Sequence, residues 1–194
     1  MCESEKTLVS REEFVLAIID IQERLASAMT HCDRVVAAAE RLAKCAALVD
    51  APIIVTRQYP KGLGSTVEGL EATLVSLAEE GARVTGVDKM SFCCTADASF
   101  ESALGATGRR QVVVVGMETH ICVAQTALAL AGSGYEVQVA ADACCSRDDM
   151  DHDVALDRLR SAGVVVTTSE AIMYEAIGAA GTPEFKQFLQ IVKD

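Results

Sequence analysis

The chain has 194 residues, of which 51% are apolar, and its net charge is −11 at pH 7. This length and apolar content suit one compact domain with a large core, so we expect residues 1–194 to form a single domain. Such an acidic protein lacks the basic patch that displaces counterions, so nucleic acids and anionic membranes are not expected partners.

Neither the start of the sequence nor its cysteines suggest export. The N-terminal stretch MCESEKTLVSREEF has no basic segment followed by an apolar core, and no apolar run reaches the roughly 18–20 residues of a membrane span. These features predict a cytoplasmic protein. The eight cysteines form no C-x-x-C pair, so we expect mostly free thiols and no structural zinc.

Six nearly continuous apolar runs alternate with longer helical stretches along the chain. Runs of this kind, rich in β-branched residues, are typical of parallel strands that are buried on both faces of a sheet. In chain order the predicted strands are 14–20, 52–58, 82–88, 111–116, 136–142 and 164–170.

The stretches between the strands predict amphipathic helices that cover the sheet. In 35–49, for example, Val35, Ala39 and Leu42 share one apolar face, with charged residues mostly opposite. Glycines at 81, 108, 134 and 163 stand where helices should end. We expect helices at 35–49, 68–80, 96–107, 119–132, 149–162, 169–178 and 184–192.

This alternation predicts an α/β fold with three αβα layers and a doubly wound, parallel, six-stranded sheet. The commonest strand order for such a sheet is 3-2-1-4-5-6, in which strands 1 and 4 are neighbours. Ligands bind beyond the carboxyl ends of these two strands, where the chain order reverses. The first strand ends at Asp20, and the fourth leads into GMETHIC, which carries Cys122. The predicted site therefore brings a carboxylate to a thiol.

Cys122 falls in the first turn of the predicted helix after the fourth strand. A helix N-terminus favours a thiolate, and its unpaired backbone amides can bind an oxyanion. We expect Asp20 to be the base, because His120 lies two residues from Cys122 and projects in another direction. Lys89, after the third strand, would place a positive charge near both groups. The alternative, purely structural roles are a small buried side chain for Cys122 and a turn-forming residue for Asp20.

Four short motifs together resemble the isochorismatase-like cysteine hydrolases, a family that includes nicotinamidases and N-carbamoylsarcosine amidohydrolase. The motifs are D-x-Q (Asp20, Gln22), a lysine followed by Ser and Phe (Lys89, Ser91, Phe92), G-x-x-T-x-x-C-V (Gly116, Thr119, Cys122, Val123) and D-A-x-x-S-R (Asp142, Ala143, Ser146, Arg147). The resemblance covers about residues 13–192. The stretches QYPKGLGSTV, GMETHICVAQTALAL and TTSEAIMYEAIG are most similar to the branch of isochorismatase domain-containing proteins.

This resemblance implies a catalytic triad of Asp20, Lys89 and Cys122. It also implies a cis peptide bond between Met117 and Glu118, with the amides of Glu118 and Cys122 forming an oxyanion hole. Metal-binding nicotinamidases carry a D-x-H pair after the second strand, where this chain reads TRQYPKGLG, so we expect no metal and no other cofactor. Isochorismate hydrolases of the family generally lack the cysteine. Its presence favours hydrolysis of an amide or carbamoyl C–N bond through a thioester.

Two other functions stay open: vinyl-ether hydrolysis of the isochorismatase type, and a non-catalytic scaffold or binding protein with a vestigial thiol. Contacts to a small-molecule substrate are assigned by position to Gln22, Arg57, Gln58, Tyr59, Phe92 and Met117. Arg57 would suit an anionic group, or it is an exposed loop residue.

Several further residues have open or minor roles. The Glu118 side chain either pairs with a basic group or is solvated. Asp142 and Arg147 are expected to tie the loop after the fifth strand. The remaining cysteines are expected in the core, with Cys93 or Cys94 at the border of the pocket as the weaker alternative.

The C-terminal stretch TTSEAIMYEAIGAAGTPEFKQFLQIV is unusually apolar for a segment after the last strand. It would cover a subunit partner or close the edge of a pocket, and we expect a homo-oligomer. Its alternative role is to cover the core of its own chain.

Overall fold

A parallel sheet of six strands lies at the centre of the computed structural model, which describes residues 8–193. Residues 1–7 and 194, and with them Cys2, lie outside the described range. The strand order is β3-β2-β1-β4-β5-β6, which confirms the predicted topology. The strands are β1 (Phe14–Ile19), β2 (Ile53–Gln58), β3 (Val84–Lys89), β4 (Gln111–Met117), β5 (Glu136–Cys145) and β6 (Val165–Thr167).

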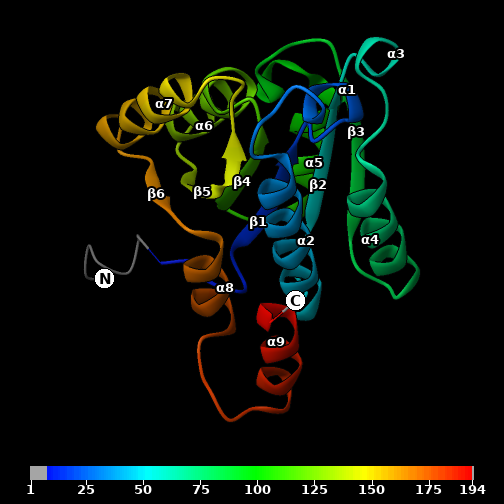
Figure 1. Cartoon of the computed structure of the whole chain (residues 1–194). Coiled ribbons are helices and arrows are strands. Elements are labelled where there is room, and N and C mark those ends of the chain that lie inside the picture. Colours follow the sequence, from blue (N-terminus) through cyan, green and yellow to red (C-terminus); the bar gives the residue numbers. More distant parts are fainter. Residues whose placement is uncertain (1–7, 194) are drawn as a thin grey trace.

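Helices cover both faces of the sheet, which confirms the three-layer arrangement (Figure 1). One face carries α2 (Cys32–Leu48), α4 (Glu68–Glu79), α8 (Ser169–Ile177) and α9 (Pro183–Lys193). The other face carries α5 (Ala98–Thr107), α6 (Ala124–Gly132) and α7 (Asp149–Ser161). The connections hold the short helical turns α1 (Glu23–Ala26), α3 (Pro60–Leu63), η2 (Cys94–Ala96) and η3 (Thr119–Val123).

Each central strand divides its side chains between two apolar cores. On β1, Leu16 and Ile18 pack toward α2, whereas Ala17 and Ile19 pack toward α5 and α6. All four side chains are fully buried. Because both faces of the strand are covered, its sequence is a continuous apolar run with no alternation of polar residues.

The predicted ranges differ from the structure mainly at short elements. β6 keeps only three residues, because the Thr168 hydroxyl accepts from the Ala171 amide and begins α8 there. The predicted helix 119–132 divides into η3, a π-helical turn, and α6. The turns α1 and α3 were not predicted, since four residues are too few to display a helical repeat.

Gly116 joins the end of β4 closely to β1. Its φ is +127°, and a Cβ at this position would overlap the backbone carbonyl of Ile19, its partner in the sheet. Only glycine fits here, so this residue type lets the ends of β1 and β4 approach each other.

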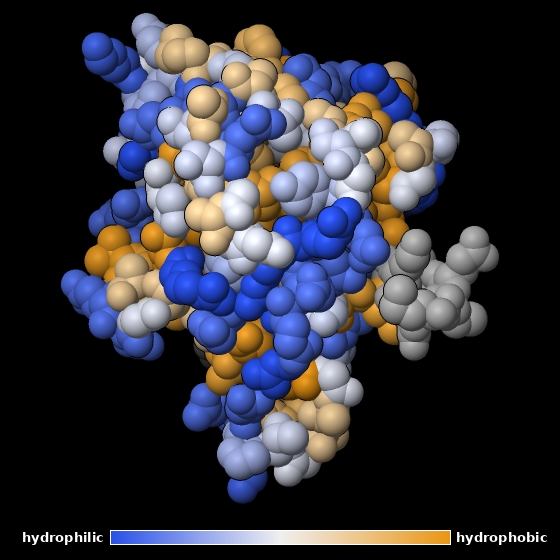
Figure 2. Space-filling model, turned by 180° about the vertical axis from the view of Figure 1, so that it is seen from behind, coloured by the Kyte–Doolittle hydropathy of each residue, from blue (hydrophilic) through white to orange (hydrophobic). Residues whose placement is uncertain are grey.

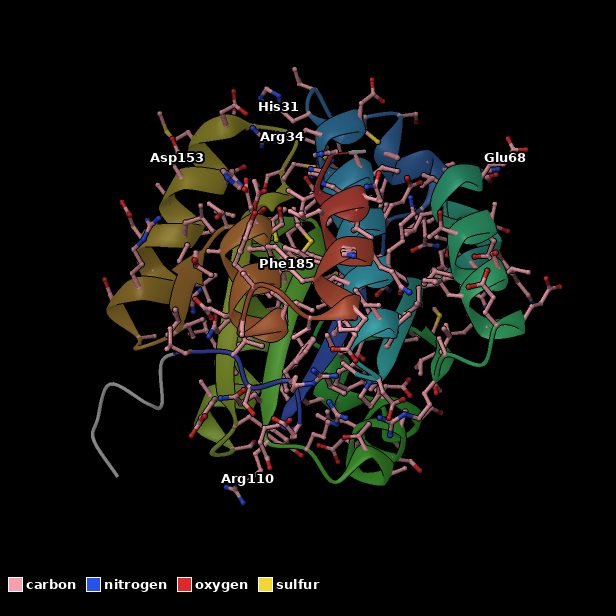
Figure 3. The ribbon with its side chains drawn as sticks, turned by 90° about the horizontal axis from the view of Figure 1, so that it is seen from below. His31, Arg34, Glu68, Arg110, Asp153 and Phe185 are labelled. Atoms are coloured by element: carbon pink, nitrogen blue, oxygen red, sulfur yellow. The ribbon has the colours of Figure 1, made fainter. Side chains whose placement is uncertain are left out.

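The apolar C-terminal stretch covers the core of its own chain. Helices α8 and α9 pack on α2, and they lie side by side in front of the sheet in the view of Figure 3, with Phe185 between them. Phe188 on α9 is fully buried, 4.8 Å from Tyr174 and 5.7 Å from Phe185 between ring centroids. The structure therefore supports the intrachain alternative, and this stretch gives no argument for a subunit partner.

The surface carries both hydrophilic and apolar side chains. On the face shown in Figure 2, hydrophilic side chains predominate and apolar ones gather in small, separate groups. Within residues 8–193, every helix is too short or too polar to cross a lipid bilayer. The seven cysteines in this range are free thiols, as predicted.

Candidate active site

Asp20 lies directly after β1 and holds a fully buried carboxylate. Its φ is +52°, in the left-handed region that Asp tolerates better than most residues. The Asp20 amide donates to the carbonyl of Thr56 at 3.2 Å. This backbone turn at the end of the strand aims the carboxylate along the carboxyl edge of the sheet.

Lys89, the last residue of β3, forms a buried ion pair with Asp20. Its Nζ donates to Asp20 Oδ2 at 2.6 Å, to Gln58 Oε1 at 2.8 Å and to the Ser91 carbonyl at 3.2 Å. Neither charged side chain is exposed to solvent. Burial lowers the pKa of Lys89, but the charges of Asp20 and of the neighbouring cysteines raise it by more, so the ammonium is retained.

Cys122 lies in η3 and is 5% exposed. Burial raises the pKa of its thiol, and the charge of Asp20 and the hydrogen bond to Asp20 raise it further, against the lowering effect of Lys89. Burial and Asp20 therefore favour the neutral thiol in the resting protein, and the thiolate favoured by the helix N-terminus stays a prediction. At rest the cluster consists of a thiol, a carboxylate and an ammonium group.

Glu118 stands at the junction of β4 and η3, after a cis peptide bond between Met117 and Glu118. Its buried side chain accepts from the Arg147 amide and from Arg147 Nε, each at 3.0 Å. Of the two roles left open for this side chain, the structure shows pairing with a basic group. Arg147 ties the loop after β5 as expected, whereas Asp142 lies within β5 and accepts from the amide of Ser169, the first residue of α8.

His120 points away from the cluster. Its Nδ1 lies 2.9 Å from Ser146 Oγ, and its Nε2 lies 3.7 Å from Asp151 Oδ2 on α7. This confirms that His120 does not face Cys122.

Gln22 and Gln58 hold the loops around the cluster. Gln22 Nε2 donates to the carbonyls of Gln58 and Gly64, at 3.0 and 2.8 Å, and its Oε1 accepts from the Gln58 amide at 2.7 Å. Gln58 in turn accepts from Lys89. Their buried amides therefore position Lys89, whereas Tyr59 and Phe92 expose 47% and 56% of their surface beside it.

The structure does not bring the side chains of Arg57 and Met117 to the cluster. Arg57 alternates with Thr56 along β2, so it projects from the opposite face of the sheet, where its Nε donates to Asp88 Oδ1 at 2.7 Å. Met117 is fully buried in the core beside α2. The substrate contacts assigned to these two side chains are therefore corrected. The alternation of side chains along a strand explains why each one points away from the cluster.

Two further residues adjoin the cluster: Thr56, which the sequence did not single out, and Cys94, which the sequence offered only as the weaker alternative. The Thr56 hydroxyl donates to Asp20 Oδ1 at 2.7 Å, and both side chains are fully buried. Cys94 is also buried, with its amide donating to Thr126 Oγ1 at 3.0 Å. Burial raises the pKa of Cys94 to about 11, while Lys89 and the hydroxyl of Thr126 lower it. In the sequence, Thr56 looked like an ordinary β-branched strand residue, and only the pairing of β2 with β1 reveals its place.

Residues 14–171 match the isochorismatase domain. The chain belongs to the isochorismatase family. Isochorismatase domain-containing protein 1 of Salmo salar is 38% identical over 90% of this chain, and the chain spans only 59% of that relative's length. Isochorismatase domain-containing protein 2 of Xenopus laevis is 35% identical, over 93% of this chain and 83% of the relative.

Solved structures with this isochorismatase fold carry different descriptions. A protein described as MAR1 ribonuclease from Caenorhabditis elegans superposes with a TM-score of 0.85 at 32% identity, over 96% of this chain and 93% of that one. The YcaC protein of Escherichia coli, described as an octameric hydrolase of unknown specificity, gives a TM-score of 0.83 at 22% identity, over 95% and 90% of the two chains. At that lower identity the likeness shows the fold alone.

The donor groups of this isochorismatase domain do not converge on a metal site. Within residues 8–193, no three side chains of His, Cys, Asp or Glu are grouped so that they could hold a metal ion.

Proposed function

We propose that this protein is a cysteine hydrolase that cleaves the C–N bond of a small amide or carbamoyl compound. The observation that carries the proposal is the buried Asp20 carboxylate, which lies 2.6 Å from the Lys89 ammonium and whose charge raises the pKa of the buried Cys122 thiol. A buried acid–base group near a nucleophile is the arrangement that covalent acyl transfer needs.

The first half of the reaction forms a thioester. Asp20 accepts the Cys122 proton while the sulfur attacks the carbonyl carbon of the substrate. The amides of Glu118 and Cys122 are the proposed donors to the resulting oxyanion, and the Glu118 amide donates to no carbonyl in the described part of the chain. The protonated Asp20 then gives its proton to the leaving nitrogen, so ammonia or an amine departs.

The second half hydrolyses the thioester. Asp20, ionised again, takes a proton from water, whose oxygen attacks the thioester carbon. The carboxylic or carbamic acid leaves, and the proton returns to Cys122 sulfur. Lys89 stays charged throughout and stabilises the negative charge that moves between Asp20 and Cys122.

Fewer residues are proposed to contact the substrate than the sequence suggested. Tyr59 and Phe92 stay proposed contacts, because they are exposed beside Lys89. Gln22 and Gln58 act through Lys89 and the loops that they hold. The guanidinium groups of Arg57 and Arg147 are both paired with carboxylates, so neither is a ready partner for a substrate anion.

The experiment is a screen of small amides, ureas and carbamates that detects released ammonia. The Cys122→Ala variant should not turn over the compounds that the wild type hydrolyses. Intact-protein mass spectrometry should show an acyl adduct on the wild-type protein. Cys45→Ala, which removes a buried thiol from α2 in the other core, is the matched control and should stay active. Ammonia release that survives Cys122→Ala would overturn the proposal.

RNA cleavage is the second candidate, because one relative at 32% identity is described as a ribonuclease. The net charge of −11 opposes it, since RNA binding needs compensating cations. Incubation with single-stranded RNA, with Cys122→Ala in parallel, separates the two functions. Isochorismate, tested in the same screen, covers the vinyl-ether alternative, and a protein inert toward all of these would fit the scaffold alternative.

We also propose that the protein forms a homo-oligomer; the YcaC protein, which shares the fold, is described as octameric. A cytoplasmic location stays a prediction, and the free thiols fit a reducing compartment.

A further inference from the structure

Thr56 and Asp20 hold each other through two hydrogen bonds. The strands β1 and β2 pair in parallel, with Ile19 opposite Thr56. Directly beyond this pair, the Asp20 amide donates to the Thr56 carbonyl at 3.2 Å, and the Thr56 hydroxyl donates to Asp20 Oδ1 at 2.7 Å. One hydrogen bond thus joins the two backbones, and the other joins the two side chains.

The two oxygens of the Asp20 carboxylate have different partners. Oδ2 accepts from Lys89 Nζ at 2.6 Å, whereas Oδ1 accepts from the Thr56 hydroxyl. Because Oδ1 and Oδ2 each accept a hydrogen bond from a different residue, the plane of the carboxylate cannot rotate without breaking a buried hydrogen bond. A neutral, protonated carboxyl group would lose part of this support, since a donated hydrogen bond favours the ionised form.

We propose that Thr56 is a positioning residue that keeps Asp20 oriented and ionised, so that Asp20 accepts the Cys122 proton. This inference rests on the proposed function and adds a residue to it. Lys89 supplies the charge on one oxygen, and Thr56 supplies the neutral donor that fixes the other.

A purely structural role for Thr56 makes a different prediction. A buried hydroxyl needs a partner, and Asp20 would then serve Thr56 only as an acceptor. Removal of the hydroxyl would lower the stability of the fold but would leave the reactivity of Cys122, and its dependence on pH, unchanged.

The experiment measures the rate at which acrylamide, a small neutral electrophile, labels Cys122 in the full chain between pH 5 and 9. Peptide mass spectrometry reports each cysteine separately, so Cys32 on α2 serves as an internal reference. Thr56→Val should slow Cys122 labelling about 10- to 100-fold near neutral pH, the size expected for losing a hydrogen bond to a charged group. It should also move the acidic limb of the profile to higher pH. Thr56→Ser, which restores the donor, should recover most of the rate.

Thr126→Val is the matched control. Thr126 is as fully buried as Thr56, and its hydroxyl accepts from the Cys94 amide and has no hydrogen bond to Asp20. We expect it to lose stability without a shift of the labelling profile. Cys32 labelling should stay the same in all variants, which shows that each one is folded.

Two results would overturn the inference: a Thr56→Val profile that superposes on the wild type, or an equal shift in Thr126→Val. Asp20→Asn separates this failure from failure of the proposed function. If Asp20→Asn slows Cys122 and Thr56→Val does not, only the role of Thr56 falls. If neither variant slows Cys122, the base assigned to Asp20 falls as well.

Discussion

Lys89 Nζ lies 2.6 Å from Asp20 Oδ2, and both side chains are excluded from solvent. Such a pair is costly to break, because one partner alone leaves an unpaired buried charge. The same contact therefore carries consequences for stability and for chemistry.

Lys89→Met should lower the free energy of unfolding by about 3–5 kcal/mol, since it strands the Asp20 carboxylate. Adding Asp20→Asn to this variant should recover a large part of the loss, because the second change removes the stranded charge. Urea unfolding of the wild type, both single variants and the double variant measures the coupling. Strictly additive losses would contradict a buried, energetically coupled pair.

Deprotonation of Lys89 should remove the stability that Lys89 contributes on the alkaline side. Its pKa is raised above the usual 10.5 of an unfolded lysine, so the contribution is complete below that pH and is lost as the pH rises above it. Urea midpoints measured between pH 8 and 11 should fall less steeply for the Asp20→Asn, Lys89→Met double variant than for the wild type. Parallel declines would show that other groups account for the alkaline loss.

Asp20→Asn tests whether Asp20 is a base or only a neighbouring charge. Burial and Asp20 together raise the pKa of Cys122, while Lys89 lowers it. If Asp20 were only a negative charge, its removal would favour the thiolate and speed acrylamide labelling at pH 7. As a base it accepts the thiol proton, so we expect labelling at least about 10-fold slower, with a rate that climbs as the pH rises. Cys32 in the same sample provides the reference.

Gly116→Ala should destabilise the fold by more than about 3 kcal/mol, because the new Cβ meets the Ile19 carbonyl at a φ of +127°. The matched control is Gly105→Ala in α5, where a Cβ meets nothing and φ is not positive. That change should stabilise the protein by about 0.5–1 kcal/mol. Thermal melts of the two variants and the wild type test this prediction. Similar shifts of the melting temperature in both variants would contradict the close approach of β1 and β4.

Exhaustive dialysis against a chelator should leave the Cys122 labelling rate and any hydrolysis unchanged, since no metal-ligand cluster exists within residues 8–193. Activity that disappears on chelation and returns with zinc or iron would refute this.

Sedimentation at micromolar concentration should give a mass above the 20.5 kDa of one chain. A single species at 20.5 kDa would reject the homo-oligomer.

Local patterns in the sequence determined the fold of this protein. Continuous apolar runs such as QVVVVG are typical of strands covered on both faces, and the observed β4 begins where predicted and ends one residue later. The alternation of such runs with helices leaves few topologies, and the commonest one is observed. Asp20 and Cys122 followed from the same logic, because the topology places the ends of β1 and β4 side by side.

The tertiary structure alone decided which side chains surround those two residues. Arg57 and Thr56 are adjacent in sequence, yet they project from opposite faces of β2, so one reaches Asp88 and the other reaches Asp20. Which face meets the site depends on the pairing register of β1 and β2, a long-range property that no local pattern encodes. The protonation of Cys122 is likewise set by burial and by Asp20, charges and atoms that lie far away along the chain and close in space.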